Sequence, residues 1–178
     1  MMKTYTALLR GINVGGGNKV PMADLRKLAE GLGWHGVKSY IASGNLVFVA
    51  DGAPEALAET LRAAMTDQMG IEVPILVLPA ADIRAALAAC PWPDAQGNRV
   101  HVNFLFGEAA LDAALYQALK TSDKEIIMQP GRAWIHTPNG FGASKLAIKL
   151  KKVITGSDMT ARNLNTLRKL AVMVDAGQ

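Results

Sequence analysis

The chain has 178 residues, of which 50% are hydrophobic and 19% are charged, and its formal net charge at pH 7 is +4. No apolar run approaches the ~18–20 residues of a membrane span, and the N-terminus lacks the hydrophobic region of a signal peptide. A single cysteine excludes an internal disulfide and a thiolate zinc cluster. We therefore expect a compact cytoplasmic protein, with one large domain or two small ones, that makes no contact with membranes.

The first half of the chain predicts alternating strands and helices. Apolar runs predict strands at residues 4–9, 37–42, 46–50 and 73–78, and helical apolar stripes predict helices at 21–32 and 54–69. The turn Ser43-Gly44-Asn45 separates the second strand from the third. The resulting order, βαββαβ, is the split βαβ or ferredoxin-like pattern.

The second half repeats much of this order after a linking helix at 80–90 and a Pro-rich loop at 91–98. We predict strands at 100–106, 125–128 and 133–136, and helices at 108–120, 143–154 and 160–175. The predicted fold is α+β with two ferredoxin-like halves, namely residues 1–79, a linker at 80–98, and residues 99–178. Because no residue-level repeat is visible, the duplication is inferred from topology alone.

Basic side chains gather toward both ends of the sequence. Residues 1–50 carry six Lys or Arg against two Asp or Glu, and residues 139–178 carry seven against two. Residues 51–98 carry two against seven. This asymmetry suggests an acidic ligand or partner, although basic faces exposed to solvent would give the same count.

The loop between the first strand and the first helix is long, glycine-rich and polar. It runs from Arg10 through three consecutive glycines to Lys19 and Pro21. It matches neither a P-loop nor a Gly-x-Gly-x-x-Gly motif. Arg10, Lys19, Asn13, Asn18 and the free N–H groups before the helix could nevertheless bind a carboxylate or phosphate. The alternative is that the glycines only permit a tight connection.

Two further segments near the C-terminus carry basic residues at predicted helix starts. Ser144 and Lys145 follow Gly140-Phe141-Gly142, and Lys145, Lys149 and Lys152 fall on one face of the predicted helix. A lysine face exposed to solvent explains this stripe equally well.

The second of these segments begins at Thr160, which we predict to be an N-cap. Arg162 then falls in the first helical turn, where it is unfavourable by roughly 0.3–1 kcal/mol unless an anion binds beside it. An exposed arginine, or an ion pair with the acidic middle segment, is the alternative.

Catalytic machinery is not evident. His35, His101 and His136 lack metal-ligand spacing, and Cys90 fits a small core residue better than a nucleophile. No general base accompanies the basic loops. We therefore predict no metal site and leave catalytic residues, cofactors and enzymatic activity unassigned.

Five motifs carry a resemblance to a known family. They are Ala7-Leu8-Leu9-Arg10-Gly11-Ile12-Asn13-Val14-Gly15-Gly16, Lys19-Val20-Pro21-Met22, Ser39-Tyr40-Ile41-Ala42-Ser43-Gly44-Asn45, Gly142-Ala143-Ser144-Lys145-Leu146, and Thr160-Ala161-Arg162-Asn163-x-x-Thr166. On these motifs the chain resembles the bacterial family catalogued as domain of unknown function 1697. The resemblance implies a two-part α+β, ferredoxin-like fold in a cytoplasmic bacterial protein, and it implies no activity. Leu164 departs from the aromatic residue that relatives often carry after the Arg-Asn pair.

We hypothesise that the polar segments converge on one cleft that binds a small phosphorylated or carboxylated ligand. The candidate ligand-binding residues are Arg10, Asn13, Asn18, Lys19, Ser43, Asn45, Ser144, Lys145, Thr160, Arg162 and Asn163. One alternative is a nucleic-acid-binding module that stacks bases on Tyr5, Tyr40 and Phe48. Others are an enzyme acting on a phosphorylated metabolite and a protein-interaction role, as a monomer or a homodimer.

Overall fold

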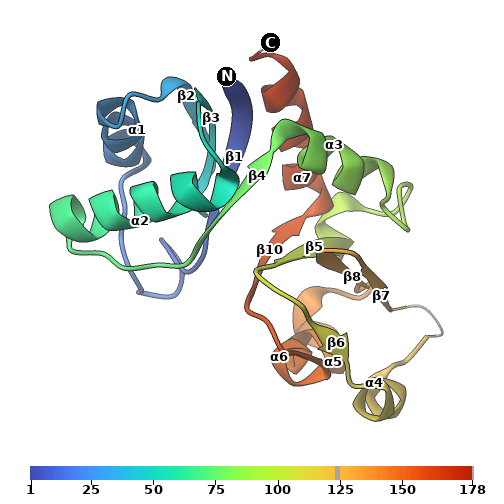
Figure 1. The fold of residues 1–178 in the computed structure, drawn as a ribbon. Helices are drawn as coiled ribbons and strands as arrows, with labels where there is room; N and C mark the ends of the chain where they lie inside the picture. The colour runs from blue at the N-terminus through green and yellow to red at the C-terminus, as the bar shows by residue number, and fades with distance from the viewer. Residues whose placement is uncertain (123–124, 178) are drawn as a thin grey trace. The chain divides into compact units, whose positions relative to one another are not determined.

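The computed structural model describes residues 1–122 and 125–177, and its fold is mixed α+β with antiparallel sheets. The chain forms two compact units (Figure 1). Unit 1 comprises Met1–Ala86 together with Lys169–Gln178, and unit 2 comprises Leu87–Arg168. The last ten residues therefore belong with the N-terminal segment.

Unit 1 contains one four-stranded sheet and two long helices. Its elements are β1 (Lys3–Leu9), α1 (Met22–Gly31), β2 (His35–Tyr40), β3 (Asn45–Ala50), α2 (Pro54–Met69) and β4 (Ile75–Pro79), followed by most of α3 (Ala80–Ala88). The strand order is β2-β3-β1-β4, and all neighbouring strands are antiparallel. The order of elements agrees with the βαββαβ order that the sequence predicts.

The core of unit 1 lies between the sheet and the helices α1 and α2. Alternate residues of β1, Tyr5, Ala7 and Leu9, face this core, together with Leu25 of α1 and Leu61 of α2. Within it the Phe48 ring stacks on the Trp34 ring, with centroids 4.0 Å apart, and on the Tyr5 ring at 5.9 Å. Burial of these large apolar side chains fixes the position of α1, and therefore of the loop that precedes it.

Unit 2 contains a second four-stranded sheet and several short helices. Its elements are η1 (Gly97–Arg99), β5 (Val100–Leu105), β6 (Ala110–Leu111), α4 (Ala113–Leu119), β7 (Ile126–Gln129), β8 (Arg132–His136), η2 (Phe141–Ala143), α5 (Lys145–Ile148), α6 (Leu150–Val153), β9 (Ile154–Thr155), β10 (Met159–Asn163) and the start of α7 (Leu164–Asp175). The strand order is β10-β5-β8-β7, again with antiparallel neighbours, and β6 pairs with β9.

Two predicted helices of this half are shorter than the sequence suggests. The helix predicted at 108–120 begins at Ala113, because residues 110–111 pair with β9 and Asp112 caps the helix by accepting a hydrogen bond from Leu115 N. The helix predicted at 143–154 divides into α5 and α6 at Lys149, whose φ of −102° and ψ of 18° interrupt the helical geometry. The predicted stripe of three lysines is therefore not carried by one continuous helix.

The prediction for the last helix is wrong at its start. Residues 159–163 form β10, which pairs along its whole length with β5, and α7 begins only at Leu164. Asn163 Oδ1 accepts a hydrogen bond from Thr166 N at 2.9 Å, so Asn163 caps α7. Thr160 is therefore not an N-cap, and Arg162 does not lie in a helical turn. Pairing with β5 overrides the capping signal that the sequence carries at Thr160.

Across the described ranges, 1–122 and 125–177, none of the helices combines the length and the hydrophobicity that a bilayer crossing needs.

Candidate functional site

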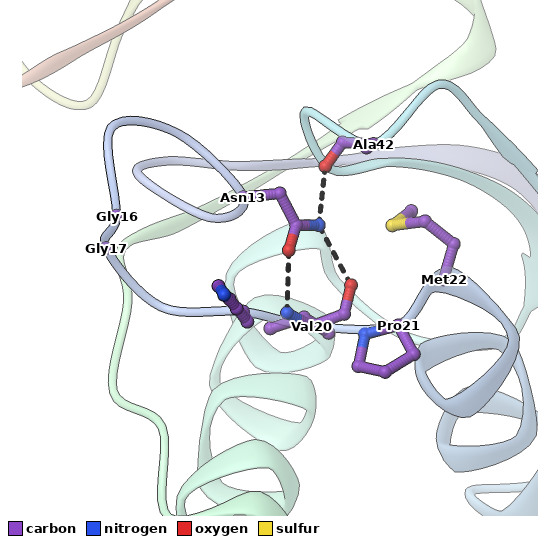
Figure 2. Close-up of a pocket in the computed structure, with 8 residues that line it drawn as sticks. Asn13, Gly16, Gly17, Val20, Pro21, Met22 and Ala42 are labelled. Carbon is purple, nitrogen blue, oxygen red and sulfur yellow. Dashed lines mark hydrogen bonds between the residues drawn. The ribbon is translucent and has the colours of Figure 1, made fainter.

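The loop between β1 and α1 is held in shape by the side chain of Asn13. The Asn13 Nδ2 donates to Val20 O and to Ala42 O, each at 2.8 Å, and Oδ1 accepts from Val20 N at 2.7 Å (Figure 2). The backbone N–H of Asn13 also donates to Asn18 O at 2.7 Å. These bonds tie the two ends of the loop to each other and to the β2–β3 turn.

The backbone of this loop requires left-handed conformations. Asn13 has a φ of +55°, and Gly15 and Gly16 have φ values of +58° and +77°. Asparagine and glycine adopt this region at lower cost than other residues. The sequence Asn-x-Gly-Gly therefore meets a conformational requirement of the loop.

The base of the loop packs closely against the β2–β3 turn. Ile12 is fully buried, and Leu9 N donates to Gly44 O at 2.9 Å. A Cβ on Gly44 would lie 2.8 Å from Leu9 Cβ and 2.9 Å from Ile12 Cδ1, and the φ of Gly44 is +96°. Glycine is thus required where the turn and the loop meet.

A hollow of about 500 Å³ opens beside this loop (Figure 2). We call it the β1–α1 hollow. It is lined by Asn13, Gly16, Gly17, Lys19, Val20, Pro21, Met22 and Ala42. Lys19 is the charged residue of this lining, and the side chains of Val20, Pro21, Met22 and Ala42 make much of the wall apolar.

The electrostatics of the hollow favour a negative charge. Lys19 is exposed and has no ion-pair partner within the part of the chain that the structure describes. The N-terminus of α1 opens at Pro21 and Met22, and no side chain caps it. Uncapped N–H groups and the helix dipole place partial positive charge there. Asp24 lies in the first turn of α1 but does not line the hollow.

Other predicted residues of unit 1 contribute to the frame around the hollow. Asn45 is fully buried, and its Nδ2 donates to Tyr40 O and to Ser43 Oγ, so it closes the β2–β3 turn. Arg10 is half-buried, and its backbone N–H donates to Pro74 O. Asn18 is exposed and accepts from Asn13 N through its backbone oxygen. Only Asn13 and Lys19 of the predicted set line the hollow itself.

The remaining predicted residues belong to unit 2. Ser144 caps α5 by accepting a hydrogen bond from Ala147 N at 3.1 Å, and Lys145 beside it is exposed. Thr160 and Arg162 are 2% and 6% exposed, and the guanidinium donates to Thr160 Oγ1 and to Ala161 O, each at 2.8 Å. Burial lowers the pKa of Arg162 to about 10, so it remains a cation at neutral pH. A single cleft shared by the residues of both units stays a prediction.

Two buried titratable residues outside these segments, Cys90 and His101, fit structural roles. Burial raises the pKa of the Cys90 thiol, which disfavours a reactive thiolate, and burial lowers the pKa of His101. The His101 ring meets the Phe141 ring edge-on, with centroids 4.9 Å apart. Within residues 1–122 and 125–177, no three His, Cys, Asp or Glu side chains are grouped as a metal would require.

With this geometry in view, comparison with known proteins assigns a family. The profile of the proteins of unknown function DUF1697 matches residues 2–134. The chain belongs to the DUF1697 family. The matched range contains the β1–α1 loop, the hollow and the β2–β3 turn, which confirms the family that the sequence motifs indicate.

Solved structures of similar proteins include a conserved bacterial protein from Streptococcus pneumoniae. It is 28% identical to this chain, the alignment covers 98% of this chain and 99% of the other, and the TM-score is 0.70. The similarity therefore extends through both units. A comparison with curated proteins found no match.

Sequence reasoning missed the apolar side of the site in this DUF1697 protein. Val20, Pro21, Met22 and Ala42 line the hollow, although only polar and charged residues were expected to do so. A signal was present, because the motif Lys19-Val20-Pro21-Met22 keeps three apolar residues directly after the lysine. This short hydrophobic run is typical of a helix start, so its contribution to the lining of the hollow is seen only in the structure.

Proposed function

We propose that this protein binds a small anionic ligand, carrying a phosphate or a carboxylate, in the β1–α1 hollow. The observation that carries the proposal is an exposed lysine, Lys19, on a loop whose shape is fixed by three hydrogen bonds of Asn13. A site that is ordered before binding loses less conformational entropy when the ligand arrives.

Three features of the hollow support an anion over a neutral ligand. Lys19 supplies a full positive charge, the uncapped start of α1 supplies partial positive charge, and Gly16 and Gly17 leave the loop backbone accessible. Among the residues that the structure describes, none that lines this space is acidic. The apolar wall formed by Val20, Met22 and Ala42 favours a ligand in which an apolar group adjoins the charged one.

The alternative of a nucleic-acid-binding module has less support. Tyr5 and Phe48 are 3% and 0% exposed and stack within the core of unit 1, so their faces are not available to bases. Tyr40 is half-buried. An enzyme acting on a phosphorylated metabolite remains an alternative that uses the same hollow, with binding as its first step.

We also infer that both units are ferredoxin-like and arose by duplication. Each sheet is antiparallel and places its first strand between its third and its fourth, as β2-β3-β1-β4 in unit 1 and β7-β8-β5-β10 in unit 2. Identical strand order and direction in both units support a common ancestor, although the sequence carries no residue-level repeat.

The binding proposal is tested by isothermal titration of inorganic phosphate, nucleotides, sugar phosphates and small carboxylates. We expect at least one of these anions to bind, and the Lys19→Ala change to weaken its binding about 3- to 10-fold through loss of one charge contact. The matched control is Lys27→Ala, which removes an exposed lysine of α1 that does not line the hollow. Equal weakening by both variants, or no binding by any anion, would overturn the proposal.

Salt dependence separates this function from nucleic-acid binding. A pocket ligand that contacts one lysine should lose little affinity between ~50 and ~200 mM salt, whereas a phosphate-backbone binder loses affinity steeply over the same range.

A further inference from the structure

β2 is an edge strand whose outer side is open. It pairs with β3 and lies at the end of the order β2-β3-β1-β4. Outside that pairing, no backbone group in the described ranges hydrogen-bonds to the backbone of residues 35–40. An open strand edge presents unpaired N–H and C=O groups to which another strand can add.

A groove of about 530 Å³ lies beside this strand, and we call it the β2 groove. It is lined by β2 from Val37 to Tyr40, by Arg26 of α1, and by the last part of α7 with Val172 and Met173. All of these residues belong to unit 1. Val172 is 62% exposed and Met173 is half-buried, so α7 presents apolar surface to the groove.

The charged residues that line the groove are basic. They are Arg26, Lys38 and Lys169, and among residues 1–122 and 125–177 no Asp or Glu lines it. The Arg26 guanidinium donates to Ser39 Oγ, which holds this cation beside the strand. Lys38 and Lys169 are exposed.

The positive charge of the groove distinguishes two possible occupants of the open edge, a second copy of this chain and an acidic segment of another protein. The β2 edge of a second copy would bring the same three cations into the groove, and like charges at close range oppose such pairing. An acidic segment would meet complementary charge along the groove and would find apolar contacts at Val172 and Met173.

We propose that the β2 groove binds an extended acidic segment of a partner protein, which adds to unit 1 as a strand beside β2. In this mode of recognition the main-chain hydrogen bonds provide affinity, and alternate side chains of the segment provide specificity. The groove selects a segment that combines acidic residues, which meet Lys38 and Lys169, with apolar residues that contact Val172 and Met173.

The test uses a fluorescent eight-residue peptide of alternating Glu and Val, with binding followed by anisotropy. In one control peptide every Glu is replaced by Lys. The other control keeps the sequence but carries N-methyl groups on alternate amides, which blocks strand pairing without changing the charge. We expect the Glu peptide to bind at least tenfold more tightly than either control. We expect Lys38→Glu and Lys169→Glu each to weaken it about 3- to 10-fold.

Matched variants make the result specific to this groove. Lys27→Glu changes an exposed lysine outside the groove, and Lys19→Ala changes the β1–α1 hollow, so neither should alter peptide binding. The two proposals can therefore be tested separately: anion binding in the hollow can fail while peptide binding in the groove holds, and peptide binding can fail while anion binding holds.

Several outcomes would overturn the proposal. They are no binding, equal binding of the N-methylated peptide, and equal weakening by Lys27→Glu. Analytical ultracentrifugation tests the remaining occupant, a second copy of this chain. If the protein forms a homodimer, and the Lys38→Glu change weakens or strengthens that dimer, the edge binds a second copy instead.

Discussion

Two segments of this protein share residue types and have opposite environments. The loop from Arg10 to Pro21 and the segment from Met159 to Thr166 both combine asparagine with a basic residue next to a helix start. In the loop, Lys19 is exposed beside a hollow. In the second segment, Arg162 is 6% exposed on a strand of a sheet.

The difference shows that the pairing of the backbone decides the role of a polar motif. Between β1 and α1 the strand pairing found among the described residues is a single bridge from Ile12 to Asn18, and the side chain of Asn13 ties the loop together. Residues 159–163 pair with β5, and this pairing directs alternate side chains into the protein. The same residue types therefore form a site in one place and part of the interior in the other.

The largest expected effect is at the buried arginine. Arg162→Ala should lower the free energy of unfolding by about 3 kcal/mol, because a cavity opens and Thr160 Oγ1 loses a donor. Urea denaturation measures this loss, with exposed Lys145→Ala as the control that should stay within about 0.5 kcal/mol. A loss as small as that of the control would contradict the structural role of Arg162.

The junction of the loop and the β2–β3 turn should respond next. Gly44→Ala should cost about 2–3 kcal/mol, because the new Cβ meets Leu9 and Ile12 at under 3.0 Å. Gly15→Ala is the matched control, since its φ is also positive but nothing lies within 4 Å of the added atom. That control should cost about 1 kcal/mol, the penalty of the left-handed conformation alone. Equal losses in thermal unfolding would show that the junction is not closely packed.

Removing the organiser of the loop should have a smaller effect on stability. Asn13→Gly keeps the left-handed backbone at low strain and removes three hydrogen bonds, so we expect a loss of about 1–2 kcal/mol. Hydrogen exchange of the amide of Gly17, which donates to Val14 O, should accelerate. The control is Asn18→Ala, at an exposed neighbouring residue, which should leave the exchange rate of the Gly17 amide unchanged. If Asn13→Gly also left this rate unchanged, the side chain of Asn13 would not anchor the loop.

The smallest effect concerns the cap of α7. Asn163→Ala should lower stability by about 1 kcal/mol, because the Thr166 N–H loses its acceptor, and Asn163→Ser should restore most of it. Thermal unfolding of both variants measures the difference. If Asn163→Ala left the stability unchanged, Asn163 would not be the residue that caps α7.

The sequence predicts unit 1 better than unit 2 for a physical reason. In unit 1 the periodicity of long elements is strong, and the loop is marked by glycines and asparagine that its left-handed conformations require. In unit 2 the elements are short, and their limits depend on pairing with distant strands, as β6 pairs with β9 and β10 with β5. Local propensity at Thr160 and at 108–112 carries no information about those partners.

The candidate site follows the same division. Lys19 and Asn13 could be selected from the sequence because the loop is locally encoded. The apolar lining residue Ala42 could not, because the β2–β3 turn meets the loop through contacts between residues far apart in sequence, such as the hydrogen bond from Asn13 to Ala42 O. Arg162 was selected for its charge, and its burial depends on the strand partner that the sequence alone does not reveal.

The most direct test of anion binding in the β1–α1 hollow is an NMR titration of amide shifts with inorganic phosphate. We predict saturable shifts at Gly16, Gly17, Lys19 and Met22, which weaken in Lys19→Ala and persist in Lys27→Ala. Shifts that lie elsewhere, or that remain unchanged in Lys19→Ala, would contradict the account.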